Sequence, residues 1–151
     1  MYRLWALGLL MVCLTAGCGS DKRPAPKDSV TVSGVVTLDG KPLEKATVRF
    51  VPTSESDQGY GGSGVTDSVG KYELSSLVEE KVVVGTPPGK YRVVVTKLVK
   101  PDGTVADPME PPMMSAARES IPLKYSDYGQ SKLDATVATT GGTFNFDLKS
   151  K

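Results

Sequence analysis

Apolar and polar residues alternate along several short stretches of this chain. Within residues 45–50 every second side chain is apolar, which is the period of a strand that buries one face. A run rich in β-branched residues, 32–37, precedes this stretch, and the dipeptide Asp39-Gly40 lies between the two. Because Asp-Gly readily adopts the positive φ angles that a tight turn needs, the pattern predicts a β-hairpin.

The same alternation recurs at residues 71–75, 90–96, 133–137 and 144–148. Stretches rich in Gly, Pro, Asp and Ser separate these strands, as in a β-sandwich and unlike alternating strand and helix units. The side chains expected to face the core are Ala46, Val48, Phe50, Tyr72, Leu74, Tyr91, Val93, Val95, Leu133, Ala135, Val137, Phe144, Phe146 and Leu148, whereas Lys45, Thr47 and Arg49 are expected to face the other way. We therefore predict one all-β domain, a single antiparallel β-sandwich.

Three stretches fit this pattern less simply. Ile121 and Leu123, two positions apart, predict a short strand before Tyr125. The apolar residues 81–85 do not decide between a strand and another conformation. Residues 98–120 are rich in proline and lack periodicity, so they are expected to form one long loop. No helix is predicted beyond the N-terminal segment.

The first 18 residues predict export and a lipid anchor. Arg3 is followed by an apolar run, residues 4–14, which is shorter than the roughly 20 residues of a membrane-spanning helix and is typical of a signal peptide. The small residues before Cys18 resemble a bacterial lipobox, in which the cysteine thiol is acylated and the peptide is cut just before it. Thr15 stands where that motif usually has leucine, so an ordinary secretory signal cut just upstream of the cysteine is the alternative.

This assignment divides the chain into three parts. Residues 1–17 are the signal peptide, residues 18–29 are the lipidated cysteine and a polar, proline-containing flexible tether, and residues 30–151 form the folded domain. Gly19 follows the cysteine, where an aspartate would retain a lipoprotein in the inner membrane under the enterobacterial sorting rule. By that analogy the protein is expected at the outer membrane, held by several acyl chains.

Removal of the signal changes the composition. Cys18 becomes the only cysteine and is acylated, so the domain has no disulfide and must be stabilised by burial alone. Loss of Arg3 reduces the 18 basic side chains to 17, equal to the 17 acidic ones. This balance gives no reason to expect a nucleic-acid partner.

The chain contains no histidine. Nucleophiles activated by histidine, histidine-dependent zinc sites and the usual neutral-pH proton transfer are therefore excluded. Paired carboxylates at Glu79 and Glu80, or at Asp107 and Glu110, would suit glycosidic chemistry, but they lie in expected loops, where solvated charge is the common explanation. We predict that the protein is not an enzyme and carries no cofactor or metal.

Two short sequences that contain aspartate and glycine are considered as calcium-binding sites. Asp67 with Gly70, and Asp102 with Gly103, offer single and scattered carboxylates, whereas calcium takes about six to eight oxygen ligands. An aspartate that accepts backbone N–H groups next to a glycine at positive φ is a common turn. Both sequences therefore predict turns.

The methionines of the mature chain are concentrated in the expected loop 98–120. They are Met109, Met113 and Met114. Thioethers suit copper(I), and they also make adaptable apolar contacts. Because no histidine and no free cysteine supports a metal, contact with a protein partner is favoured over copper. A flexible proline-rich insertion, or methionine side chains that cover an edge of the sandwich, are the remaining alternatives.

Several motifs together resemble the carboxypeptidase regulatory-like domain family. They are VSGVVTLDGKPL (32–43) with ATVRF (46–50), then GVTDSVGKY (64–72) and PPGKY (87–91). The ending, residues 121–125 and 144–148, is similar to a bacterial lipoprotein subgroup of that family. The resemblance implies a prealbumin-like (transthyretin-like) Greek-key sandwich of about seven strands and a non-catalytic module. The histidines and the C-terminal tail on which transthyretin-like hydrolases depend are absent.

We therefore predict an exported, lipid-anchored β-sandwich that presents its loops to a protein of the cell envelope. A carbohydrate-binding envelope module is the alternative, with Tyr125 and Tyr128 as stacking surfaces for sugar rings. The lack of tryptophan in the mature chain weakens this alternative.

Overall fold

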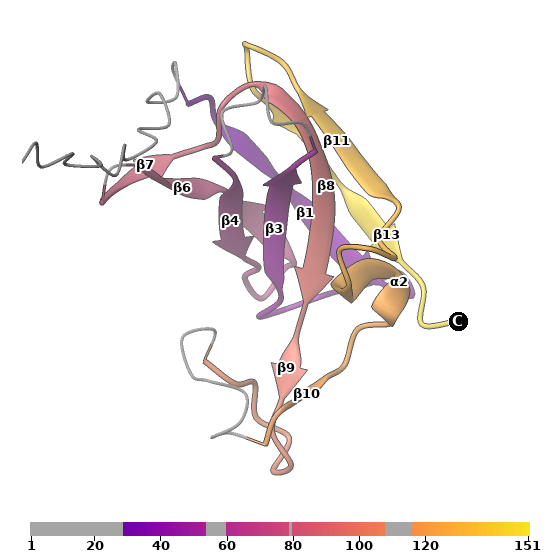
Figure 1. The fold of residues 1–151 in the computed structure, drawn as a ribbon. Coiled ribbons are helices and arrows are strands. Elements are labelled where there is room, and N and C mark those ends of the chain that lie inside the picture. The colour runs from indigo at the N-terminus through magenta and orange to yellow at the C-terminus, as the bar shows by residue number, and fades with distance from the viewer. Residues whose placement is uncertain (1–28, 54–59, 79, 108–115) are drawn as a thin grey trace, which may run out of the picture.

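The computed structural model describes residues 29–53, 60–78, 80–107 and 116–151 (Figure 1). In these residues nearly all regular structure is β-strand, arranged in two packed sheets with a small two-stranded arm at one end. This confirms the predicted all-β sandwich. No helix in the described part of the chain is long and apolar enough to cross a membrane.

The larger sheet has six antiparallel strands in the order β11-β8-β3-β4-β6-β7. They are β3 (Thr47–Pro52), β4 (Gly62–Val65), β6 (Ser75–Val78), β7 (Lys81–Val84), β8 (Gly89–Thr96) and β11 (Leu133–Val137). β6 and β7 form a hairpin, so residues 81–84 of the stretch that the sequence left open are an edge strand, and Gly85, with a φ of 91°, follows it.

The smaller sheet is built around β1 (Val32–Leu38). β2 (Lys41–Pro42) and β5 (Lys71–Glu73) pair with β1 antiparallel, while β12 (Gly142–Thr143) and β13 (Phe146–Leu148) pair with it in parallel. The chain enters β12 and β13 from β11 of the other sheet, so no tight hairpin forces them to run against β1. Between β1 and β2, Asp39 has a φ of 51° and Gly40 a φ of 78°, which confirms the predicted turn.

The two sheets enclose one core, with Phe50 of β3 at its centre. Phe50 is completely buried, and four aromatic rings have centroids 5.8 to 6.4 Å from its own. Tyr91 belongs to the same sheet, whereas Tyr72, Phe144 and Phe146 come from the side of the smaller sheet. The side chains that the alternation placed inward are buried, with two of them partly buried at the margin of the core.

A buried hydroxyl joins segments from the middle and the end of the chain. The Tyr72 hydroxyl donates a hydrogen bond of 2.7 Å to the carbonyl oxygen of Phe144. Burial disfavours the charged phenolate and raises the pKa of Tyr72 well above its ordinary value. The Phe144 N–H donates in turn to the Ser33 carbonyl oxygen at 2.8 Å, so Phe144 is held from two sides.

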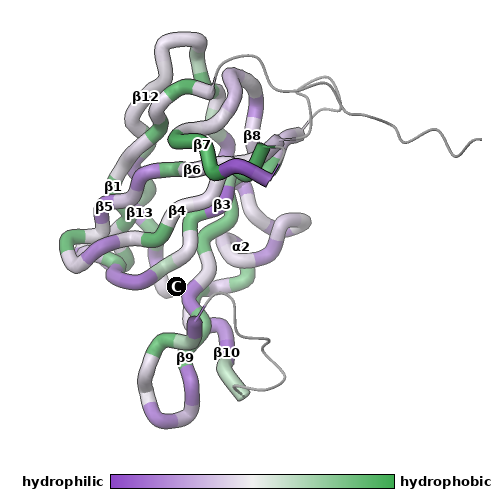
Figure 2. Tube along the Cα trace, turned by 90° about the vertical axis from the view of Figure 1, so that its left-hand side faces the viewer, coloured by the Kyte–Doolittle hydropathy of each residue, from purple (hydrophilic) through white to green (hydrophobic). Residues whose placement is uncertain are grey.

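Residues 98–120, expected to form one long loop, begin and end in a two-stranded arm. β9 (Leu98–Val99) pairs antiparallel with β10 (Arg118–Glu119), and the arm projects from one end of the sandwich, as Figure 1 and Figure 2 both show. The prediction of an irregular segment was therefore wrong at both ends of this stretch. Strands of two residues are too short to show a period of two in the sequence.

The Glu119 carboxylate fixes the base of the arm. One of its oxygens accepts the N–H of Lys97 at 2.9 Å and the N–H of Ile121 at 2.8 Å. The N–H and the hydroxyl of Ser120 both donate to the Lys97 carbonyl oxygen, at 3.0 and 2.8 Å. The two chain segments that form the arm are thus joined where they leave the sandwich.

Replacing Glu119 by alanine is expected to loosen the arm without unfolding the sandwich. Two partly buried N–H groups would lose their charged acceptor, at a cost of about 1–3 kcal/mol. Hydrogen exchange at the amides of Lys97 and Ile121 should therefore accelerate by roughly tenfold or more, while exchange at Val93 in β8 stays as in the wild type. Equal acceleration at Val93 would contradict this local role.

The segment after the arm is helical. α2 (Leu123–Ser126) is a single turn that follows Pro122, whose φ of −55° suits the start of a helix. Ile121 is buried but Leu123 is 60% exposed, so the strand predicted from their spacing was wrong. The apolar side chains that pack on the core are Ile121 and Tyr125, four residues apart, which is the spacing of a helical turn.

Candidate functional site

One face of the six-stranded sheet turns away from the core. Because side chains alternate between the two faces, Thr47 and Arg49 of β3 point outward between buried neighbours. The register places Thr47 between Thr96 of β8 and Val65 of β4. Arg49 lies beside Ser63 in the next row. Side chains far apart in the sequence therefore share one small area of the outer face.

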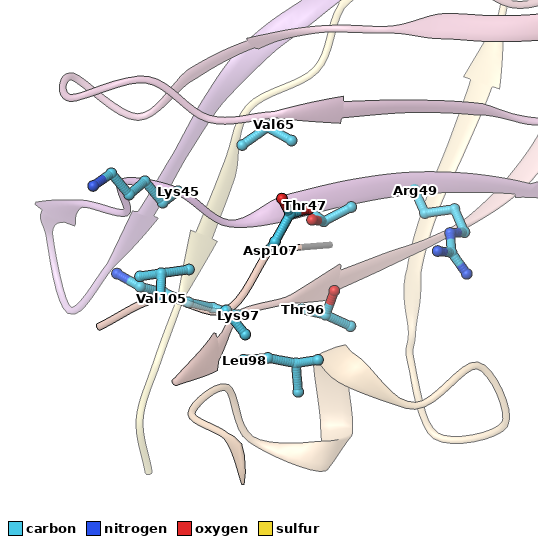
Figure 3. Close-up of a pocket in the computed structure, with 10 residues that line it drawn as sticks. Lys45, Thr47, Arg49, Val65, Thr96, Lys97, Leu98, Val105 and Asp107 are labelled. Atoms are coloured by element: carbon cyan, nitrogen blue, oxygen red, sulfur yellow. The ribbon is translucent and has the colours of Figure 1, made fainter. Parts of the chain in front are cut away.

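A groove of about 490 Å³ lies between this outer face and the first part of the arm. This arm groove is lined by Lys45, Thr47, Arg49, Val65, Thr96, Lys97, Leu98, Val105, Ala106 and Asp107. In Figure 3, Lys45 and Arg49 lie toward opposite ends of the groove, with Thr47 between them and Leu98 on the side of the arm. One strand of the sheet, the ends of two others and a doubled-back segment of chain thus form its walls.

A turn within the arm brings the chain back to the sheet. The Ala106 N–H donates to the Leu98 carbonyl oxygen at 2.8 Å, which holds the returning segment against the start of the arm. The Asp102 carboxylate accepts the hydroxyl and the N–H of Thr104, at 2.7 and 2.8 Å, and these bonds lower the pKa of Asp102. With Gly103 at a φ of 84°, this confirms the predicted turn.

The other carboxylates considered for metal or catalysis have local roles or lie apart. The Asp67 carboxylate accepts the N–H groups of Val69 and Lys71 at 3.0 and 2.8 Å, as in the predicted turn. Of the two carboxylate pairs, only Glu80 and Asp107 are described; Glu80 lies in the β6–β7 turn and Asp107 beyond β9. Within the described ranges, no cluster of three or more His, Cys, Asp or Glu residues could hold a metal ion.

The arm groove carries more positive than negative charge. Lys45, Arg49 and Lys97 supply cations, against one carboxylate, that of Asp107, among its lining residues. The Lys45 ammonium lies 3.9 Å from the exposed carboxylate of Glu44, and a surface pair of this kind has little energetic weight. No residue that the structure describes forms an ion pair or a hydrogen bond with the side chains of Arg49 or Lys97. The groove therefore presents cationic groups that the described fold does not neutralise.

Arg92, one row away on the same sheet face, makes three contacts with its surroundings. Its guanidinium forms a 2.7 Å ion pair with Asp134 and a 2.7 Å hydrogen bond with the Ser131 carbonyl oxygen. It also lies 5.9 Å from the centre of the Tyr128 ring, within reach of a cation–π interaction. Arg92 therefore joins β8 to the loop before β11, whereas Arg49 makes no such contact with the described residues.

Arg49 also borders a second hollow of about 520 Å³ on the same face. The other residues that line it are Phe50, Val51, Pro52, Tyr60, Gly61, Gly62, Ser63, Ser75 and Leu77. Leu77 is 66% exposed there. A ligand in either depression would therefore meet the guanidinium of Arg49.

The residues singled out for lipidation and for the partner loop, Cys18, Met109, Met113 and Met114, lie outside the described residues. Tyr125 is partly buried against the core, and its hydroxyl accepts the N–H of Lys149 at 3.2 Å. Tyr128 is 49% exposed, with the Arg92 guanidinium over its ring. Neither tyrosine lines the arm groove.

One signal for the arm groove is present in the amino-acid sequence. The alternation in residues 45–50 placed Lys45, Thr47 and Arg49 on the outward side of a strand. Nothing in the sequence shows that Thr96 and Val65 lie beside Thr47, because that depends on the pairing of β3 with β8 and β4. The groove was therefore missed.

Comparison with protein-family models and with curated proteins gave no match. Among solved structures, the chain is similar to BcpA, the major pilin subunit of Bacillus cereus, with a TM-score of 0.39 and 11% sequence identity. The similarity covers 80% of this chain and 29% of the pilin chain, so this chain spans less than a third of that protein's length. A likeness of this degree assigns neither a family nor a function, and the resemblance to the carboxypeptidase regulatory-like family stays a prediction.

Proposed function

We propose that this protein is an exported, lipid-anchored, non-catalytic binding module that presents its β-sandwich to a protein partner at the cell envelope. The observation that supports this most directly is the arm groove, which is lined by three cationic side chains. Among the described residues that line it, Asp107 carries the only carboxylate, and the Glu44 carboxylate lies 3.9 Å from the Lys45 ammonium. The lack of histidine in the chain argues against most neutral-pH catalysis.

The partner in this proposal enters the arm groove and contacts the arm. The arm projects beyond the sandwich, so a partner that reaches it does not have to pack closely on both sheets (Figure 1). Met109, Met113 and Met114 belong to the chain segment between β9 and β10, and we propose that they add adaptable apolar contacts to this interface.

The anchor is Cys18, joined to the domain by the tether that ends at residue 29. Val30 and Thr86 exchange two backbone hydrogen bonds, of 3.0 and 3.1 Å, which fasten the start of the domain beside the larger sheet. A polar tether with two prolines would hold the sandwich away from the membrane and leave the outer sheet face accessible. The proposed location is the outer membrane.

Replacing Cys18 by alanine is expected to abolish labelling with palmitate and to release the protein from the membrane fraction. The thiol of Cys18 is the proposed attachment atom, and Cys13 lies in the segment removed with the signal. Metabolic labelling followed by fractionation measures both effects, with Ser20→Ala as the matched control. Undiminished labelling of Cys18→Ala would contradict the anchor.

A carbohydrate-binding envelope module is the second candidate, and the 49% exposure of Tyr128 is the observation that favours it. Retention of the protein on insoluble cell-envelope polysaccharide, lost in Tyr125→Ala or Tyr128→Ala, would support this function. The same retention by the wild type and both variants would show that neither tyrosine binds the polysaccharide.

In-cell crosslinking of the anchored protein tests the proposed function. The wild type is compared with a deletion of residues 100–118, and captured proteins are identified by mass spectrometry. We expect a discrete envelope protein that the wild type captures and the deletion variant does not. Failure of the wild type to capture any protein would contradict the proposal.

A further inference from the structure

We propose that the arm groove selects an acidic, extended peptide segment, with Arg49 and Lys97 binding its Asp or Glu carboxylates. This inference rests on the proposed function, because it names the chemistry of the partner that the groove would take. It goes further by assigning the residues that would bind the carboxylates of the partner.

Arg49 is the main anchor for a carboxylate. Its guanidinium is always charged, is planar and carries donors spaced for both oxygens of a carboxylate. Its stem rises from the middle of β3, where pairing with β4 and β8 on both sides fixes the backbone. No described residue forms an ion pair or a hydrogen bond with the Arg49 guanidinium. Its N–H groups are therefore available to a ligand carboxylate.

Lys97 and Lys45 extend the positive charge beyond Arg49. Lys97 stands where β8 passes into the arm, and its backbone is fixed by Glu119 and Ser120. Lys45 precedes β3 at the far end of the groove (Figure 3). Three cations against Asp107 leave an excess of two positive charges on a chain that is otherwise nearly neutral. Such a local excess favours an anionic partner and its fast association.

The walls of the groove favour a peptide over an acidic sugar polymer. Val65, Leu98 and Val105 give apolar contacts between the charged positions, as suits the alternating side chains of an extended chain. None of the described residues that line the groove is aromatic, so it offers no ring on which a sugar would stack. The hydroxyls of Thr47 and Thr96 lie on the floor, where they can donate to ligand carbonyl oxygens.

The test uses the mature lipidated protein in detergent micelles and two fluorescein-labelled octapeptides, one alternating Glu and Val and the other alternating Gln and Val. Fluorescence anisotropy should show that the Glu peptide binds at least about tenfold more tightly at low salt, and that this preference declines as salt is added. Equal affinity for the two peptides, or no binding of either, would overturn the proposal.

Charge reversal then identifies the residues. Arg49→Glu and Lys97→Glu should each weaken binding of the Glu peptide by about tenfold or more, and Arg49→Lys by less, since it keeps the charge but loses the paired donors. Lys71→Glu, on β5 of the other sheet, is the matched control and should change affinity less than about twofold. Unchanged binding by Arg49→Glu, with wild-type circular dichroism, would overturn the role of Arg49.

Two further results separate this inference from the proposed function. Tighter binding of polygalacturonate than of the Glu peptide would overturn the peptide and make an acidic polysaccharide the ligand. Capture of the same envelope protein by wild type and by Arg49→Glu in cells would overturn acidic recognition while leaving the proposed function in place.

Discussion

Replacing Gly34 by alanine is expected to remove much of the stability of the domain. A Cβ atom at Gly34 would overlap the carbonyl oxygen of Phe144 and lie 2.6 Å from its carbonyl carbon, a distance that real Cβ contacts do not reach. Phe144 cannot simply move away, because hydrogen bonds with Tyr72 and Ser33 hold it. Displacing this backbone would cost at least about 4 kcal/mol, much of the roughly 5–15 kcal/mol that stabilises a domain.

The measurement is thermal unfolding followed by circular dichroism, together with the amount of folded protein recovered. Gly129→Ala is the matched control, since its Cβ would meet nothing closer than the Asp127 carboxylate at 3.3 Å. That control should unfold within a few degrees of the wild type. A Gly34→Ala variant with a wild-type transition would show that the chain does not cross β1 as closely as described.

Replacing Phe50 by alanine is expected to be the most destabilising truncation in the core. The side chain is completely buried and contacts rings from both sheets, so its loss leaves a cavity that neither sheet can fill. A buried Phe-to-Ala change costs about 3–5 kcal/mol. Since no disulfide is expected within the domain, nothing else would compensate for this loss.

Urea unfolding at equilibrium measures this change. Leu77→Ala, on the larger sheet with 66% of the side chain exposed, serves as the control and should cost less than about 1 kcal/mol. A loss at Phe50 as small as that at Leu77 would contradict the position of Phe50 between the sheets.

The sandwich could be predicted because its strands bury one face. Phe50, Tyr72 and Leu148 each lie in a stretch where inward apolar residues alternate with outward ones, and each is buried as expected. The short elements could not be predicted in this way. α2 has only one turn, and the two-residue spacing of Ile121 and Leu123 indicated a strand in its place. Each strand of the arm has two residues, which is too short for an alternation of apolar and polar residues to be recognised in the sequence.

The candidate site depended on register, which the sequence does not contain. Arg49 and Arg92 both lie at outward positions of strands with alternating residues, and nothing in the sequence distinguishes their roles. Only the pairing of β8 with β11 shows that Asp134 lies opposite Arg92 and neutralises it. Arg49 has Ser63 and Val94 as its neighbours in register, and neither carries a charge. Only the folded chain therefore shows that Arg92 is paired with a neighbouring carboxylate and that Arg49 is not paired with a described residue.

Overall charge does not show where charged side chains gather on the surface. The mature chain is expected to be neutral, yet three cations and one carboxylate line the arm groove. Surface pairs elsewhere, such as Lys149 with Asp147 at 2.8 Å, use up charge locally. Arg49 and Lys97 of the arm groove are among the cations that no described residue pairs.

The most direct test of the central claim, that the arm groove is the binding site, is site-specific photocrosslinking in cells. A photoreactive residue replaces Val65 in the groove or, as the control, Val35 on β1 of the opposite sheet; the two valines are 52% and 36% exposed. We predict an adduct with a discrete envelope protein from position 65 and none from position 35. Adducts from position 35 alone, or equally from both positions, would contradict the assignment of the groove as the binding site.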